Sequence, residues 1–310
     1  MLTLPRGIYR SPQNVHKSRF EVLCDWIEAS VLFDDFELSI TDIVDVLIER
    51  LIYTNQDFAR EGVVNAWEYI KLRCEWIGEC SAITIDHQWV RAKSNWQNFS
   101  AYSFCLLLSL AVNYDWWATE FGHDYNEQGE LFELLTKESL QTQFVGWKIH
   151  QTGWSRSNTN TLRGVVQEVA DLLGEPLGRL DIWDDPYAKE KGLDLLFYRP
   201  YLDKRQGIPV YLVQCASGKN WVSNLKSPVL YICKKIIQFT TDPKIAFSTP
   251  FSFLDKKFQQ NCMTNNGFFF DRNRLLGVAV NDESWVSPAL KNRLILWQTS
   301  RIDELLRRSR

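Results

Sequence analysis

The feature that most constrains the fold is the order of apolar patterns after residue 160. A helix pattern in LRGVVQEVADLLGEP precedes two strand patterns, Leu193 to Arg199 and Pro209 to Cys215. A second helix pattern, Pro228 to Phe239, and a third strand pattern, Lys244 to Phe251, follow. Strands that alternate with helices in this way form a sheet covered by helical layers. The order predicts an α/β (mixed α+β) fold, with a central mixed sheet flanked by helices.

The first 120 residues have a different texture, because their apolar residues recur mainly at helical spacing. Phe20, Leu23, Ile27 and Val31 show this spacing clearly. We expect helices over about residues 20–31, 41–51, 58–76 and 100–117, with a strand over residues 82–90. A turn-rich stretch, residues 146–160, is the best internal boundary or loop. We therefore expect a mainly helical regulatory or docking region over residues 1–121 and a second domain over residues 122–310, with its core at about 160–255.

The charge balance limits the possible partners. The net charge is −3, which argues against a protein that simply coats DNA without specificity. A metal-binding site is itself acidic, however, and basic patches can be local. Arg199, Lys204 and Arg205 form one such patch, which is either a solvated face or a phosphate contact.

Cysteine usage and hydropathy predict a cytoplasmic protein. The chain has seven cysteines and no CxxC pair, so neither a disulfide framework nor a zinc ribbon is indicated. The N-terminal segment has no apolar region typical of a secretory signal. The longest apolar run, Phe104 to Val112, is too short to span a bilayer, so we expect no association with a membrane.

The two central strand patterns predict a hairpin that brings polar residues together. The sequence PYLDKRQGIP between them is rich in turn-forming residues, and position 204 is the midpoint between Asp194 and Gln214. In an antiparallel hairpin centred there, these two residues lie opposite each other and share a face. Glu168 lies at the edge of the apolar stripe of the preceding helix, where it can point toward the sheet or into solvent.

The segments KGLDLLFYRP and VYLVQCASGKNW resemble the central hairpin of the PD-(D/E)XK nuclease superfamily. In that superfamily an acidic residue on the first strand precedes an E/Q-x-K element on the second. Asp194 matches the first-strand acid, Gln214 matches the second-strand ligand, and Glu168 resembles the acid supplied by the preceding core helix. The resemblance covers roughly residues 160 to 255 and implies a restriction-endonuclease-like core.

One position departs from the pattern. The superfamily lysine would fall two residues after Gln214, where this chain has Ala216. Lys219 or Lys226 is the alternative source of a cation at the reaction centre. Mg²⁺ or Mn²⁺ is the implied cofactor, because a hard divalent cation activates water and stabilises the charge of phosphodiester cleavage. The implied ligands are Asp194, Gln214, the backbone carbonyl of Cys215 and Glu168.

The resemblance implies a metal-dependent nuclease that cleaves DNA, as an endonuclease or an exonuclease, in restriction, anti-phage defence or repair. The chain shows neither a DNA-reading motif nor an ATPase loop, so we expect a protein partner such as a helicase or ATPase to target it. The alternative is a catalytically inactive, nuclease-like protein that binds other proteins or nucleic acid.

Overall fold

The computed structural model describes residues 1–12, 15–152, 162–179, 193–225, 236–279 and 282–310. The chain divides into two compact units. Unit 1 comprises Met1–Gly122, Pro250–Leu254 and Arg272–Arg310, and unit 2 comprises His123–Thr249 and Asp255–Asp271. The predicted second domain, 122–310, therefore ends too late, because the last 39 residues (272–310) belong to unit 1.

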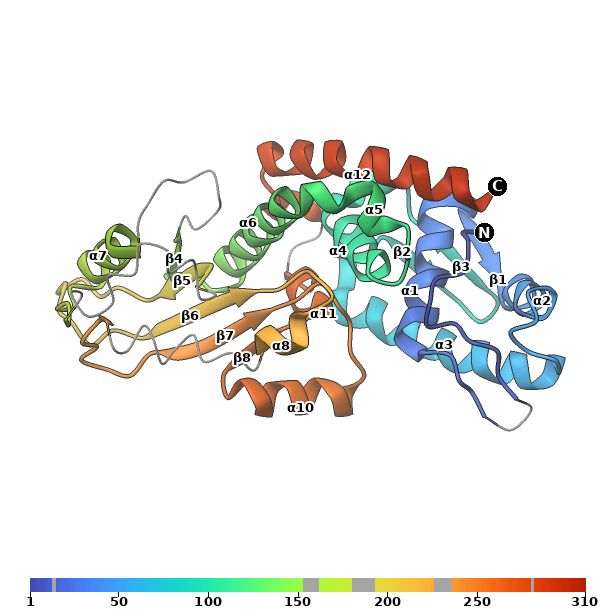
Figure 1. Ribbon diagram of the computed structural model, residues 1–310, viewed down its shortest axis with the longest axis horizontal. Helices are drawn as coiled ribbons and strands as arrows, with labels where there is room; N and C mark the ends of the chain where they lie inside the picture. Colours follow the sequence, from blue (N-terminus) through green and yellow to red (C-terminus); the bar gives the residue numbers. More distant parts are fainter. Residues whose placement is uncertain (13–14, 153–161, 180–192, 226–235, 280–281) are drawn as a thin grey trace. The chain divides into compact units, whose positions relative to one another are not determined.

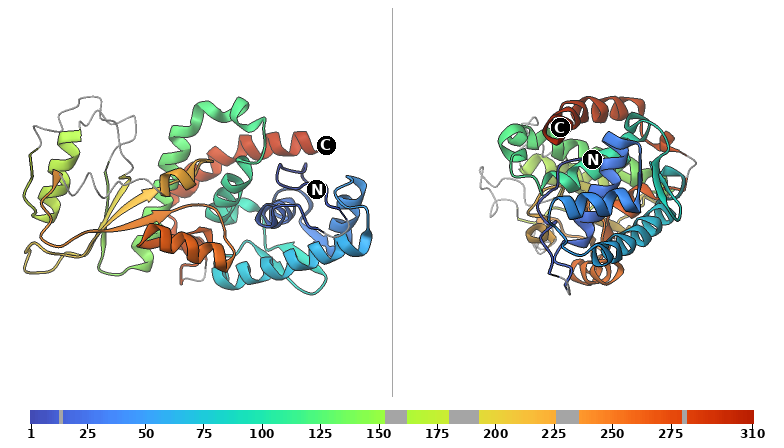
Figure 2. Two further views of the ribbon diagram at one scale, coloured as in Figure 1. Left: turned by 60° about the horizontal axis from the view of Figure 1, so that its bottom comes forward. Right: turned by 90° about the vertical axis from the view of Figure 1, so that its right-hand side faces the viewer.

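Unit 1 is built around a helix that is buried along its whole length. All residues of α4, Ser100–Ala111, are buried, and α1 and α12 pack against it. The chain termini meet in this unit, where the Thr3 N–H donates to Ser309 Oγ at 2.8 Å (Figure 2). The α-helices of unit 1 are α1 Phe20–Ser30, α2 Ile40–Glu49, α3 Gln56–Ile77, α4, α5 Trp117–Phe121, α11 Arg272–Leu276 and α12 Pro288–Ser309.

A small antiparallel sheet completes unit 1, with strand order β1-β3-β2. Its strands are β1 Glu37–Ser39, β2 Ile83–Ile85 and β3 Trp89–Ala92. The strand predicted over residues 82–90 is therefore two short strands that pair with each other. Helix α2 follows β1 directly, because Ser39 and Asp42 form a reciprocal capping box at its first turn.

Unit 2 contains the predicted mixed sheet, with strand order β4-β5-β6-β7-β8. The β4–β5 and β5–β6 pairs are antiparallel, whereas the β6–β7 and β7–β8 pairs are parallel (Figure 1). The α/β fold class is thereby confirmed. The strands are β4 Lys148–Gln151, β5 Leu195–Tyr198, β6 Val210–Cys215, β7 Lys244–Ser248 and β8 Phe268–Phe270, and the helices are α6 Tyr125–Gln143, α7 Leu162–Leu173, α8 Trp221–Leu225 and α10 Asp255–Asn265.

The two faces of this sheet are covered by different helices. On the α7 face, Leu196, Tyr198 and Leu212 share a core with the apolar stripe of α7, beside the turn between β5 and β6 (Figure 1). On the α6 face, Phe197 packs against Phe144, which directly follows α6. Alternation along each strand keeps the two sets apart, since successive side chains point to opposite faces.

Close backbone contacts fix the parallel edge of the sheet. A Cβ added at Gly267, just before β8, would lie 1.9 Å from the carbonyl oxygen of Ile245 in β7. Only a residue without a side chain allows this approach.

Two expectations from the sequence differ from the structure. Strand β4 lies inside residues 146–160, which the sequence suggests as a loop, and the strand predicted from Lys244 ends at Ser248. The helix predicted over Pro228 to Phe239 lies largely outside the described residues.

Candidate active site

The predicted hairpin register is confirmed. Leu195 pairs with Val213 and Tyr198 with Val210, which centres the hairpin at position 204. Asp194 precedes β5 and is bonded to both neighbours of Gln214. Its N–H donates to the Val213 carbonyl at 3.0 Å, and its Oδ2 accepts from the Cys215 N–H at 2.6 Å. The first-strand acid and the second-strand amide therefore occupy opposing positions, as the spacing predicts.

The Asp194 carboxylate is held in a buried position by the surrounding backbone. The residue is 9% exposed. Thr152, which follows β4, donates its N–H to the Asp194 carbonyl at 3.2 Å and its hydroxyl to the Leu193 carbonyl at 2.6 Å. The end of β4 and the end of β6 thus fix Asp194 from two sides.

Gln214 and Cys215 point to opposite faces of the sheet, as alternation predicts. Gln214 is half-buried and follows Leu212 by two residues on β6, so it points to the α7 face. Cys215 lies on the α6 face. Burial raises the pKa of the Cys215 thiol, and the negative charges of Asp194 and Glu133 raise it further, against the opposing effect of the Thr136 hydroxyl.

Glu133 is a further candidate residue that the sequence did not single out. It lies on α6 and its Oε2 accepts a hydrogen bond from Gln151 Nε2, at the end of β4, at 3.0 Å. One turn along the helix, the hydroxyls of Thr136 and Ser248 lie 2.9 Å apart. These contacts hold α6 against the ends of β4 and β7, on the face where Cys215 lies. Asp194 and Glu133 are called the carboxylate pair below.

Glu168 has a different neighbour from the one expected. It lies on α7 with its side chain 50% exposed, and its Oε1 is 3.4 Å from His150 Nε2. His150 pairs with Leu196 and therefore faces α7. Glu168 thus lies at the rim of the α7 face, whereas Glu133 is on α6, the helix that covers the face where Cys215 lies.

More than one lysine could supply a positively charged side chain to this site. Lys219 is exposed, just before α8, and Lys226 lies outside the described residues. Lys137 is half-buried on α6 and follows Glu133 by four residues, which puts the two on the same side of the helix. Ala216, at the position where the superfamily has its lysine, is buried, and its N–H donates to the Ser248 carbonyl at 2.9 Å.

The oxygen donors of this site fit a hard cation that takes only a few ligands from the protein. Among the described residues, no group of three or more His, Cys, Asp or Glu side chains could hold a metal ion. Mg²⁺, however, is commonly bound through one or two carboxylates together with water and substrate phosphates. Asp194 and Glu133 are the carboxylates that could serve in that mode, with the Cys215 carbonyl as a further candidate oxygen donor.

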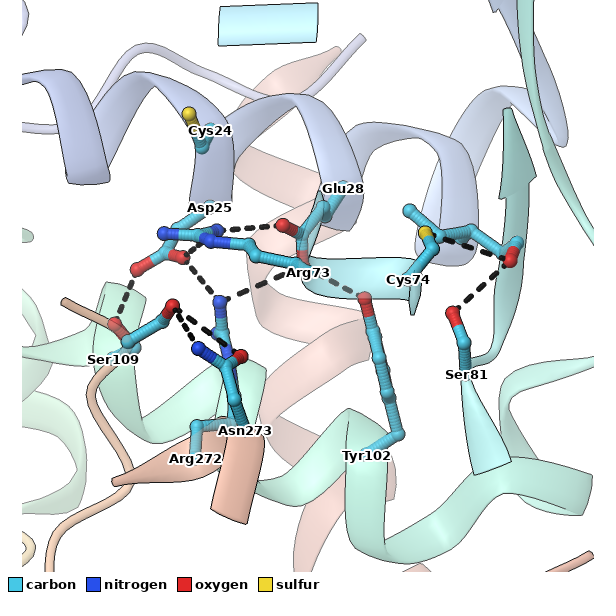
Figure 3. Close-up of polar contacts among 12 residues, drawn as sticks. Cys24, Asp25, Glu28, Arg73, Cys74, Ser81, Tyr102, Ser109, Arg272 and Asn273 are labelled. Carbon is cyan, nitrogen blue, oxygen red and sulfur yellow. Dashed lines mark hydrogen bonds and ion pairs between the residues drawn. The ribbon is translucent and has the colours of Figure 1, made fainter. Parts of the chain in front are cut away.

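A second polar cluster lies in unit 1 (Figure 3). Arg73 Nη1 is 2.8 Å from Asp25 Oδ1 and 2.6 Å from Glu28 Oε1, and Arg272 Nη2 is 2.7 Å from Asp25 Oδ1. The four side chains are at most 4% exposed. Tyr102 donates its hydroxyl to Glu28 at 2.8 Å. The cluster is balanced in charge, with two arginines and two carboxylates.

This buried cluster joins parts of unit 1 that are distant in sequence. Asp25 and Glu28 lie on α1, Arg73 on α3 and Arg272 on α11. Although burial alone would raise the pKa of Asp25, the charges of Arg272 and Arg73 lower it below its usual value. Because each of these four charged side chains is buried and takes part in an ion pair, the cluster ties the returning segment at Arg272 to the N-terminal helices.

Comparisons with known proteins give no match: no family model, no curated protein and no solved structure matches this chain. In the part of the chain that the structure describes, no helix combines the length and the apolar character needed to cross a membrane.

Proposed function

We propose that unit 2 is a Mg²⁺- or Mn²⁺-dependent nuclease of the PD-(D/E)XK type that cleaves DNA, with the carboxylate pair at its centre. The observation that supports this most is the buried Asp194 carboxylate, which accepts a hydrogen bond from the Cys215 N–H, with Glu133 held on α6 by Gln151. The strand arrangement supports it as well, because an antiparallel run, β4 to β6, continues into a parallel strand, β7.

Each residue has a defined part in this proposal. A divalent cation would supply a polarised water and neutralise phosphate charge, and Asp194 and Glu133 would hold it. Asp194 is prepared for this part, since the backbone of β4 and β6 fixes its orientation. Cys215 stays a neutral thiol because its pKa is raised, so it contributes its carbonyl rather than a thiolate. Lys137, Lys219 or Lys226 would stabilise the charge that develops on phosphate.

We also propose the setting that the sequence suggests. A helicase or ATPase partner would bring the nuclease to DNA in restriction, anti-phage defence or repair. A cytoplasmic location fits the described cysteines, which are thiols, as a reducing compartment maintains them.

The second candidate is an inactive nuclease-like protein that binds a protein or nucleic acid. The buried Ala216 favours it, because that position holds the catalytic lysine in the family that the hairpin resembles. The two proposals differ in whether any of the three lysines supports cleavage.

A plasmid-nicking assay with Mg²⁺ or Mn²⁺ tests the proposal. We expect Asp194→Asn and Glu133→Gln to lower the nicking rate by about 100-fold or more, since each removes a charged ligand. Glu168→Gln is the comparison variant, because Glu168 is half exposed on α7 and has His150 as its neighbour. Three further variants show which lysine supports cleavage: Lys137→Met, Lys219→Met and Lys226→Met. Equal nicking by the wild type, Asp194→Asn and Glu133→Gln would reject the nuclease, and so would a wild type without activity.

A further inference from the structure

Half-buried aromatic rings gather on the α6 face at the end of the sheet next to the β5–β6 turn. Tyr211 and Phe268 stack with ring centroids 4.4 Å apart and planes 9° apart. Trp147, just before β4, stacks on the buried Phe197 at 4.4 Å and lies 5.9 Å from Tyr211. The proposed cleavage centre is at the other end of β6, because Cys215 is the last residue of the strand and Tyr211 the second.

Three of these rings remain partly open to solvent. Trp147, Tyr211 and Phe268 are of intermediate exposure, whereas Phe197 beneath them is fully buried. Phe197 pairs with Tyr211 across β5 and β6, so it supports the open rings from below. We call Trp147, Tyr211 and Phe268 the aromatic platform. Its rings are held in place by their packing, and little side-chain entropy is lost when a flat ligand stacks on them.

Exposed cations flank the aromatic platform. Lys244 pairs with Tyr211 in the parallel β6–β7 register, which sets both side chains on the same face. Arg199 follows Phe197 by two residues and is exposed on that face too. Both cations therefore border the rings, one from each neighbouring strand.

The adjoining turn extends this positive edge. Lys204 adopts a left-handed backbone conformation, and Tyr201, Leu202, Lys204 and Arg205 are all exposed. Asp203 is the acidic residue among them, and its Oδ2 lies 3.9 Å from Arg205 Nε. The stretch from Arg199 to Arg205 has three cations and one carboxylate, in a chain whose net charge is −3. The positive charge is thus local to the edge where the open rings lie.

We propose that the aromatic platform, with Arg199 and Lys244, binds single-stranded nucleic acid. Bases would stack on the open rings, and the backbone phosphates would contact the two cations. Stacking on aromatic side chains beside a positive groove is how proteins bind single strands without reading their sequence. A duplex lacks free base faces and gains only the phosphate contacts. The inference deepens the proposed function and rests on it for the choice of nucleic acid as ligand, but binding needs no cleavage.

The test is fluorescence anisotropy of labelled oligo-dT and oligo-rU, about 16 nucleotides long, and of a matched duplex. The full chain is titrated with EDTA present, so that loss of cleavage cannot affect the result. We expect both single strands to bind more tightly than the duplex. Arg199→Gln with Lys244→Gln should lower the slope of log K against log salt by about 1.4, because each phosphate contact with a single strand contributes about 0.7.

The aromatic rings are tested separately. Tyr211→Leu should weaken binding by about 5- to 160-fold, the range expected when one stacked base loses its ring, whereas Tyr211→Phe should bind as the wild type does. Lys256→Gln with Lys257→Gln is the matched control, because it removes two exposed cations from α10 in the same unit. Thermal unfolding of each variant verifies its fold. If Tyr211→Leu unfolds, the variant with Arg199→Gln and Lys244→Gln still tests the site, because both of these cations are exposed.

Three results would overturn the inference. The wild type could fail to bind either single strand, or bind the duplex as tightly as the single strands. The control on α10 could also lower the affinity as much as the change at Arg199 and Lys244 does. The nicking assay is independent, so active cleavage with no binding to single strands would reject this site and leave the nuclease standing.

Discussion

Replacing Arg272 with methionine should destabilise unit 1 strongly. The guanidinium is fully buried, with Nη2 at 2.7 Å from Asp25 Oδ1 and 3.6 Å from Glu28 Oε2. At an effective dielectric constant of about 20, the closer contact alone gives a gross attraction of about 6 kcal/mol. Part of this is offset, because the cost of burying the guanidinium disappears with it. Two carboxylates would then share Arg73, and removal of one partner from a buried pair costs about 3–5 kcal/mol.

Thermal unfolding followed by tryptophan fluorescence measures this loss. At about 2–4 °C per kcal/mol for a domain of this size, Arg272→Met should lower Tm by about 6–20 °C. Arg274→Met is the matched control on the same helix, where the arginine is exposed, and a surface change there should cost at most about 0.5 kcal/mol. Similar shifts in Tm for the two variants would refute the reasoning.

The dependence of this loss on pH gives an independent check. In the wild type, Asp25 has a lowered pKa, so its ion pairs stabilise the fold above the unfolded pKa, and this contribution is lost as the pH falls. Without Arg272, protonation of Asp25 relieves the excess negative charge. The difference in Tm between the wild type and Arg272→Met should therefore shrink as the pH falls below about 4, the usual pKa of an aspartate. A difference that stays constant would mean that lost packing, rather than charge, causes the effect.

Two further predictions follow from buried groups. Burial raises the pKa of Glu283 to about 7 from 4.5, so this residue should make the fold less stable as the pH rises from 4.5 through 7, by about 3 kcal/mol in all. Glu283→Gln should flatten that part of the Tm profile, and an unchanged profile would contradict the assignment. Gly267→Ala should destabilise unit 2 by about 3 kcal/mol or more, because its Cβ would overlap the Ile245 carbonyl. The control is Gly129→Ala, where a Cβ meets no atom within 4 Å and the residue lies within α6, so that Tm should not fall.

The hairpin could be predicted in detail because its information is local. The turn sequence fixes the centre of the hairpin, and the two-residue period of a strand fixes which residues oppose each other. These two facts alone predict that Asp194 and Gln214 lie opposite each other. The orientation of Cys215 follows from the same alternation, and the structure places it on the face opposite Gln214.

The course of the chain between the units could not be predicted in this way. Local patterns identify the helices of the first 120 residues, but the last helix, α12, packs against α4. The last ten residues include the arginines Arg301, Arg307, Arg308 and Arg310. In the structure Arg301 is buried, with its guanidinium 3.8 Å from the ring centroid of Trp297. Whether a C-terminal segment joins the preceding sheet or an earlier helical core depends on contacts between distant residues, which periodicity does not encode.

The choice between Glu168 and Glu133 depends on the same kind of information. Both lie on amphipathic helices that precede the hairpin, and each borders an apolar stripe that must cover a sheet. The sequence cannot assign a helix to a face unless the edge strand is known, and β4 lies within a turn-rich segment. Once β4 pairs with β5, Gln151 meets Glu133 at its end, and His150, pointing the other way, meets Glu168. The alternation of one short strand thus separates the two acids, and Glu133 is left on the face where Cys215 lies.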